Sequence, residues 1–227
     1  MTGFIVAPYR DRVEILSDGA QYTPAGVVLG AEYKISASDV VPLAMVGSGT
    51  VDEIIALSSA ILEVADRTGS VDDTLEVLAS ALAEIGQSPS FDTAMRMAIG
   101  AISETRGPIC FVFSTFEDRG SGAKPFELQE MRRSFAQGGV PTGEDLVAYG
   151  ELSLEDGLEK DAAFLMGAMR KQKLANPARP DREPFHSVGC HVDLTVVRTD
   201  GYEHRRLFTW PDVVGEKIDP FDAALAA

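Results

Sequence analysis

Strand-like and helix-like segments occur in separate blocks along this chain, and this order constrains the fold more than any other feature of the sequence. Short runs rich in β-branched residues predict strands at 4–7, 13–16, 26–29, 33–36 and 41–46. Apolar residues at helical spacing then predict helices at about 51–65, 71–85 and, less regularly, 91–103. Further strands are expected at 109–114 and 126–128, a helix at 153–173, and a closing hairpin of 192–197 with 205–209. Blocks of this kind favour antiparallel sheets covered by helices over a strictly alternating parallel fold.

The chain is predicted to form a single domain over residues 1–227. Its 45% hydrophobic residues supply enough material for a sizeable core. The one linker-like stretch, 175–184, holds three prolines and is expected to be an exposed loop. Because the piece beyond it is too small for its own core, a second domain is not expected, and the tail at 220–227 has little to anchor it.

Charge excludes two classes of partner. With 20 basic and 35 acidic residues the formal net charge is −15, which disfavours nucleic acid and anionic membranes. No window approaches the roughly 18 to 20 apolar residues that span a bilayer. Cys110 and Cys190 are the two cysteines, and without an export-signal pattern they are expected to be reduced. Together these features predict a cytoplasmic protein.

Thr2 is the first candidate for chemistry. Removal of Met1 would leave Thr2 with a free α-amine, which titrates at about 7.7 to 8.0 and can act as general base for the Thr2 hydroxyl. Asp18 follows the second predicted strand, and Lys34 lies in a later strand. A lysine close to the amine would lower its pKa by like-charge repulsion, and an aspartate would hold that lysine in place. The plainer alternative is that none of the three residues is catalytic. Thr2 would then merely suit translation and removal of Met1, Asp18 would be a turn residue, and Lys34 would be an exposed charge on an edge strand.

These three residues and their spacing resemble those of proteasome β subunits and the bacterial HslV peptidase, which are N-terminal-nucleophile hydrolases. Asp18 lies sixteen residues after Thr2, and Lys34 lies sixteen residues after Asp18. The segments 17–21 and 43–52 also resemble that family. The resemblance implies an α+β fold, a four-layer αββα sandwich of two antiparallel sheets between helix layers. It implies a threonine peptidase in which Thr2 is the nucleophile, Lys34 tunes the amine and Asp18 orients Lys34. It also implies no metal or other cofactor.

Several positions depart from the family pattern. Met45 stands where the family has a glycine whose N–H helps to form the oxyanion hole, beside the turn that begins at Gly47. Glu151 replaces a serine. Phe185 and Val188 replace an aspartate and a serine that precede the penultimate strand. The side chain of Met45 is therefore expected to crowd the approaching substrate.

The resemblance also implies partners: a peptide or unfolded-protein substrate, a homo-oligomeric ring and an ATP-driven unfoldase. The altered residues favour a rival interpretation, a catalytically silent protein that builds a ring or part of a larger assembly. A hydrolase of small amides is a third. The cluster of His186, Cys190 and His191 lacks a fourth ligand with suitable spacing, so no metal site is predicted.

Overall fold

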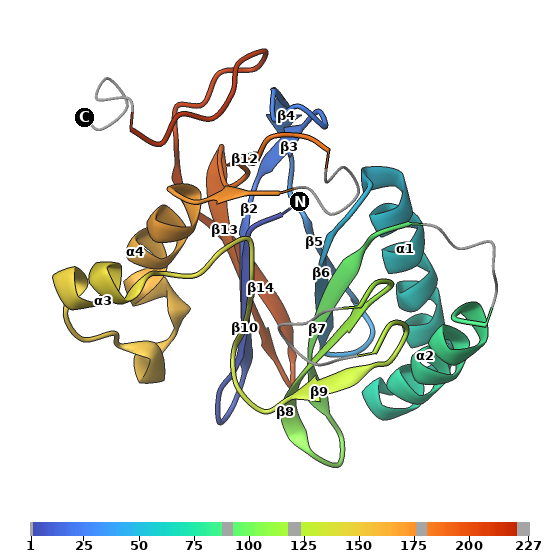
Figure 1. Ribbon diagram of the computed structural model, residues 1–227. Coiled ribbons are helices and arrows are strands. Elements are labelled where there is room, and N and C mark those ends of the chain that lie inside the picture. The colour runs from blue at the N-terminus through green and yellow to red at the C-terminus, as the bar shows by residue number, and fades with distance from the viewer. Residues whose placement is uncertain (1, 88–92, 118–123, 176–180, 222–227) are drawn as a thin grey trace.

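The computed structural model describes residues 2–87, 93–117, 124–175 and 181–221. Two five-stranded antiparallel sheets dominate it (Figure 1). We call them the β1 sheet and the β6 sheet after one strand of each. The strands of the β1 sheet lie in the order β10 (Phe135–Gln137), β1 (Phe4–Pro8), β2 (Val13–Asp18), β13 (His191–Arg198) and β14 (Gly201–Thr209). Those of the β6 sheet lie in the order β5 (Ile35–Ala37), β6 (Leu43–Ser48), β7 (Arg96–Ser103), β8 (Gly107–Ser114) and β9 (Gln129–Met131).

Two smaller sheets lie near one end of the molecule. β3 (Ala20–Tyr22) pairs with β4 (Val28–Ala31), and β11 (Lys173–Leu174) pairs with β12 (Phe185–His186). Only Gly19 separates the end of β2 from the start of β3, so the first of these small sheets continues directly from β2.

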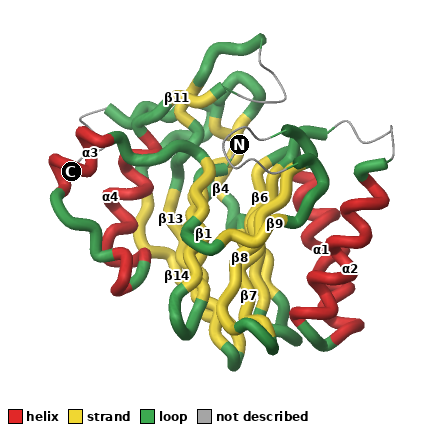
Figure 2. Tube along the Cα trace, turned by 60° about the horizontal axis from the view of Figure 1, so that its bottom comes forward, coloured by secondary structure: helices red, strands yellow, loops and turns green. Residues whose placement is uncertain are grey.

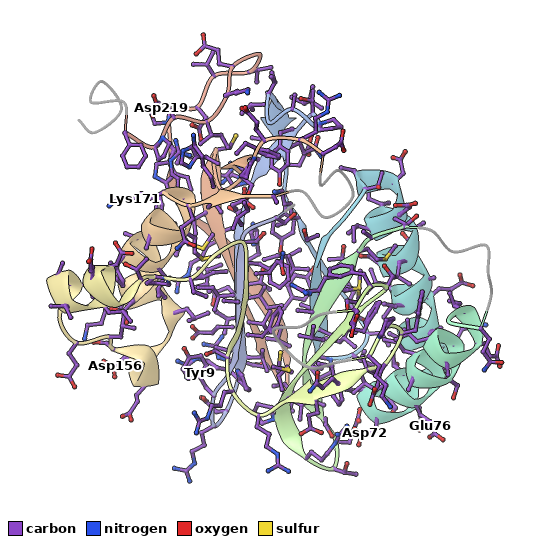
Figure 3. All side chains as sticks on the ribbon, in the orientation of Figure 1. Tyr9, Asp72, Glu76, Asp156, Lys171 and Asp219 are labelled. Carbon is purple, nitrogen blue, oxygen red and sulfur yellow. The ribbon has the colours of Figure 1, made fainter. Side chains whose placement is uncertain are left out.

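The two large sheets pack face to face around a shared apolar core. In β1, Phe4 and Val6 face the β6 sheet, whereas Ile5 and Ala7 point to the opposite side, as strand alternation requires. The sheets approach closely where a Cβ at Gly100 would lie 2.6 Å from Cγ1 of Val13. Side chains fill the space between the sheets (Figure 3), so this interface carries much of the buried apolar area.

A pair of helices covers the outer face of the β6 sheet (Figure 2). α1 (Val51–Thr68) and α2 (Val71–Ile85) are separated by Gly69, whose positive φ of 64° ends α1. The Ser70 hydroxyl accepts a hydrogen bond from Asp73 N and caps α2. Apolar residues of both helices join the outer side of the sheet in one buried cluster that includes Ile61, Leu75 and Phe113. The two helices predicted at 51–65 and 71–85 are thus confirmed.

The outer face of the β1 sheet is covered less evenly. α4 (Leu158–Arg170) packs Leu165, Met166 and Met169 against it. The shorter α3 (Gly143–Tyr149) has no buried residue, and a 3-10 turn, Leu154–Asp156, precedes α4. The single helix predicted at 153–173 is therefore wrong at its start, because Gly157, with a φ of 119°, separates the 3-10 turn from α4.

The predicted four-layer sandwich is wrong. The described residues form four sheets rather than two, with 35% strand and 27% helix. Their four helices do not make a layer on both sides, since α1 and α2 pair on one sheet whereas α4 alone packs closely on the other. The order of strand and helix blocks could not reveal this, because it says nothing of which short strands leave the main sheets.

Two local predictions also fail. Residues 96–103 of the expected helical piece form β7, whose residues are nearly all buried because the strand is covered on both faces. Residues 126–128 were expected to be a strand, but Phe126 has a φ of 61° and β9 begins only at Gln129. The closing hairpin is confirmed as β13 and β14. Parts of the predicted loop at 175–184 and tail at 220–227, namely 176–180 and 222–227, lie outside the described residues.

We expect Phe113→Ala to lower the free energy of unfolding by about 3–5 kcal/mol, because it removes a fully buried ring from the core beneath α1 and α2. Urea denaturation measures this loss. Val147→Ala is the matched control, since Val147 is 85% exposed on α3 and its loss should change stability by less than about 0.5 kcal/mol. Equal effects of the two substitutions would contradict the placement of Phe113 in the core.

Candidate active site

Asp18 brings Lys34 and the N-terminal segment together. β1 and β2 pair so that Phe4 lies opposite Ser17, which places residues 2 and 3 beside Asp18. Lys34 Nζ lies 2.9 Å from Asp18 Oδ1, and Gly3 N donates to the same oxygen at 2.9 Å. The structure therefore places two of the three predicted residues, Asp18 and Lys34, in direct contact, and it places the third, Thr2, one residue from that contact.

The carboxylate of Asp18 is fully enclosed by donors. Its second oxygen, Oδ2, accepts hydrogen bonds of 3.1 Å from Ala20 N and from Gly189 N. The side chain of Asp18 has no exposed surface and that of Lys34 only 12%. Four donors from four segments offset the hydration that the buried carboxylate loses.

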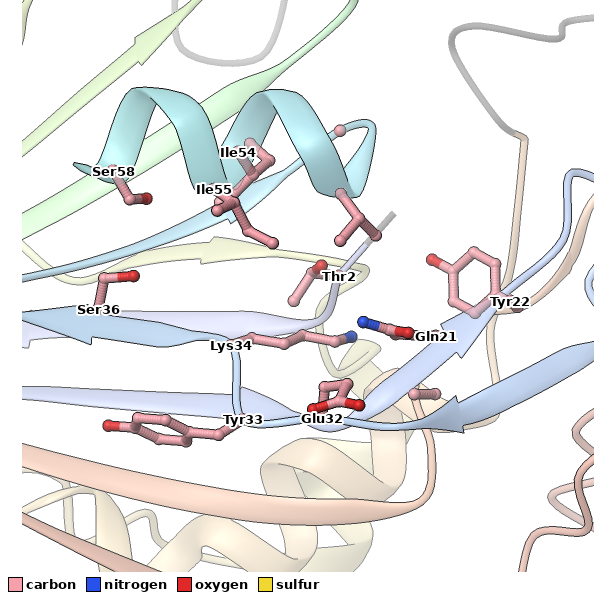
Figure 4. Close-up of a pocket in the computed structure, with 14 residues that line it drawn as sticks. Thr2, Gln21, Tyr22, Glu32, Tyr33, Lys34, Ser36, Ile54, Ile55 and Ser58 are labelled. Carbon is pink, nitrogen blue, oxygen red and sulfur yellow. The ribbon is translucent and has the colours of Figure 1, made fainter. Parts of the chain in front are cut away.

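Thr2 lies in a cleft of about 360 Å³. Figure 4 shows Ile54, Ile55 and Ser58 of α1 on one side of Thr2, and Gln21 and Glu32 on the side of the strands. Lys34 lines the same cleft, so the ion pair with Asp18 borders the space next to Thr2. The cleft therefore combines a hydroxyl, a cation and an apolar wall.

The nitrogen of Thr2 has a specific partner. Thr2 N donates to Ser48 Oγ at 3.0 Å, and Ser48 is the last residue of β6. Ser48 was not among the predicted site residues. The signal that could have identified it is the Gly-Ser-Gly-Thr sequence at 47–50, between a strand and a helix.

The turn after β6 points the start of α1 towards the cleft. Gly47, Gly49 and Val51 line the cleft, and Val51 is the first residue of α1. Within the described chain the Thr50 side chain makes no capping hydrogen bond. The amides of this first turn carry the positive end of the helix dipole, which favours negative charge nearby.

Met45 does not crowd the cleft, contrary to the prediction. It pairs with Ser36 on one side and Ile99 on the other, so its backbone lies inside the β6 sheet. Strand alternation directs its side chain into the core beneath α1 and α2, where it is fully buried. Gly47, by contrast, lines the cleft, and a Cβ there would lie 2.6 Å from Cδ1 of Ile54.

The altered C-terminal positions have apolar surroundings. Val188 is buried against the N-terminal segment, where a Cβ at Gly3 would lie 2.5 Å from Val188 Cγ2. Gly138 approaches Gly3 as well, because a Cβ added at Gly138 would lie 2.6 Å from Gly3 Cα. Phe185 packs edge-on against Tyr22, with ring centroids 5.0 Å apart. Glu151 is exposed and does not line the cleft.

A buried histidine lies beneath the turn that follows Asp18. A Cβ at Gly19 would overlap the His191 ring, at 2.1 Å from Cε1. His191 Nε2 lies 3.0 Å from Asp193 Oδ2, and Arg206 Nε donates to Asp193 Oδ1 at 2.9 Å. Burial lowers the pKa of His191, while the nearby Asp193 opposes that shift.

The described residues contain no group of three or more histidine, cysteine or acidic side chains that could hold a metal ion. His186 is separate from His191, and its Nδ1 lies 3.1 Å from the carbonyl oxygen of Arg170. In the described part of the chain, no helix is both long enough and apolar enough to cross a membrane.

No family model and no curated protein matches this chain.

Asp18→Asn should lower the free energy of unfolding by roughly 3–5 kcal/mol, because it leaves the Lys34 cation without its buried partner. Chemical denaturation measures the loss, and the double variant with Lys34→Met should lose less than the sum of the two single variants. Asp66→Asn, at an exposed position of α1, makes the same chemical change as a control. Additive losses in the double variant would contradict a stabilising ion pair.

Stability should also depend on pH through His191. Because burial lowers the pKa of His191 in the folded protein, the unfolded chain binds a proton more readily as the pH falls below the ordinary value of 6.5. The difference in unfolding free energy between the native chain and His191→Gln should therefore be constant above about pH 7.5 and change below about pH 6.5, in the direction of a less stable native chain. Denaturation across this range measures it, and a difference that is independent of pH would contradict the prediction.

Proposed function

We propose that this protein is an N-terminal-nucleophile hydrolase that cleaves peptide bonds through Thr2 once Met1 is removed, with catalytic residues like those of proteasome β subunits and HslV. The surroundings of Thr2 carry the proposal: Thr2 borders a cleft, its nitrogen lies 3.0 Å from Ser48 Oγ, and the next residue, Gly3, shares the carboxylate of Asp18 with Lys34. A merely structural N-terminus would not require a buried lysine and aspartate beside it.

The proposed reaction uses the nitrogen of Thr2 as its base. After Met1 removal this nitrogen is an α-amine, which accepts the proton of the Thr2 hydroxyl while Oγ1 attacks the carbonyl carbon of the substrate. The cation of Lys34 disfavours protonation of that amine, and Ser48 Oγ orients it. The amine then gives the proton to the leaving nitrogen, the C–N bond breaks, and water hydrolyses the resulting ester.

The oxyanion of the tetrahedral intermediate needs donors that are already in place. The candidates are the backbone N–H groups of Gly47, Gly49 and Val51, since these three residues line the cleft near the start of α1. This assignment replaces Met45, whose backbone is engaged between two strands.

The resemblance extends the proposal to assembly and location. A homo-oligomeric ring fed with unfolded protein by an ATP-driven unfoldase is the arrangement that the family suggests. A reducing, cytoplasmic compartment is supported by the two cysteines, which are both free and buried.

A catalytically silent protein is the second candidate. It is favoured by Val188 and Phe185, whose buried apolar side chains occupy positions where the family has polar residues. Intact-mass measurement of the N-terminus discriminates between the two candidates, because a retained Met1 would leave Thr2 without a free amine.

Thr2→Ala should reduce the turnover of fluorogenic peptide amides by more than about 10³-fold, because it removes the nucleophile. Mass spectrometry must first show that Met1 is absent from both proteins. Thr199→Ala, at an exposed position beside the β13–β14 turn, is the control and should keep full activity. Undiminished turnover in Thr2→Ala would overturn the assignment, and turnover of small amides but not of peptides would indicate a small-molecule amidase.

A further inference from the structure

We propose that the cleft selects a lysine or arginine side chain on the substrate residue whose carbonyl Thr2 attacks, with Glu32 as the residue that recognises its charge. This inference rests on the proposed function and adds its substrate class. It is carried by the unequal distribution of charge and apolar surface around Thr2.

Glu32 supplies the unbalanced charge of the cleft. Among the residues that the structure describes, the charged side chains that line the cleft are those of Glu32 and Lys34. The charge of Lys34 is matched by Asp18 at 2.9 Å, whereas Glu32 makes no ion pair with any described residue. A cationic group that enters the cleft therefore meets a carboxylate that is free to bind it, and an acidic group meets repulsion.

The backbone of Glu32 is held next to the turn that follows Asp18. Its backbone N–H donates to the carbonyl oxygen of Gly19 at 2.9 Å. Gly19 directly follows Asp18, and Lys34 is two residues after Glu32. This hydrogen bond fixes the backbone from which the exposed side chain of Glu32 extends at the cleft.

The opposite wall suits the stem of a long side chain. Ile54, Ile55 and Val51 of α1 line the cleft, and Ile55 and Val51 are 58% and 46% exposed. Figure 4 shows Ile54 and Ile55 on the side of Thr2 opposite to Glu32. A lysine or arginine can cover this apolar surface with its methylene groups while its head reaches the carboxylate.

The volume of the cleft permits such an occupant. At about 360 Å³ it has the size of a small-ligand pocket, which is ample for one long side chain. Ser36 and Gln21 add neutral polar groups beside the charged one. Size alone would also admit a large apolar side chain, so the charge of Glu32 is the feature that discriminates.

The test is a set of peptide amides that differ only at the residue before the cleaved bond, which is lysine, norleucine or glutamate. Norleucine keeps an aliphatic stem and lacks the charge. We expect the native protein to cleave the lysine peptide with a kcat/KM about tenfold above that of the norleucine peptide, and the glutamate peptide most slowly. The preference for lysine should weaken at high salt, because Glu32 is exposed.

Glu32→Gln should bring the ratio of lysine to norleucine cleavage close to one, and Glu32→Lys should favour the glutamate peptide. Glu63→Gln removes the same charge from an exposed position of α1 that does not line the cleft, so it should leave the ratio unchanged. An unchanged ratio in Glu32→Gln would overturn the inference while leaving the proposed hydrolase intact.

Binding separates failure of the inference from failure of the proposed function. Thr2→Ala protein without Met1 should bind a fluorescent lysine peptide more tightly than its norleucine counterpart, and Glu32→Gln added to it should abolish the difference. Equal binding of the two peptides would overturn the inference. If the native protein cleaves no peptide yet the binding preference depends on Glu32, the hydrolase proposal fails and the recognition of cations stands.

Discussion

The buried carboxylate of Asp18 joins the parts of the chain on which the rest of the site depends. It accepts hydrogen bonds from Gly3 on the way into β1, from Ala20 at the start of β3, from Gly189 ahead of β13, and from Lys34 ahead of β5. These segments belong to both large sheets and to one small sheet. A buried charge needs such donors, so the carboxylate of Asp18 holds these four segments together beside the cleft.

The proximity of Thr2 to Asp18 could be predicted from sequence because both residues belong to one hairpin. β1 and β2 are adjacent in the chain, and their pairing alone brings the N-terminal residues beside Asp18. The proximity of Lys34 to Asp18 could not be predicted from the hairpin, and it was predicted from the sixteen-residue spacing that resembles the family pattern. Ser48 was missed because its contact with Thr2 spans 46 residues, and Met45 was misplaced because a motif does not state which face of a strand a residue occupies.

The fold was predictable where the spacing of apolar residues and a capping residue indicated the same helix, as in α2 with Ser70 as its cap. It was also predictable at the tight turn between β13 and β14. It was not predictable for β7, where an almost continuous apolar run reads equally well as helix or strand. The pairing in the small sheets lies beyond sequence reasoning for a different reason, since strands of two to four residues pair only when tertiary contacts bring them together.

If Thr2 is the nucleophile, the close packing around Gly3 matters for the rate of the reaction as well as for the structure. Val188 and Gly138 hold Gly3 from separate segments at distances that leave no room for another side chain. Chain ends are ordinarily the most mobile part of a domain, and a nucleophile at a free end would lose that freedom at each encounter with substrate. In the proposed hydrolase this loss of entropy would occur once, when the protein folds, and Thr2 would meet every substrate already oriented.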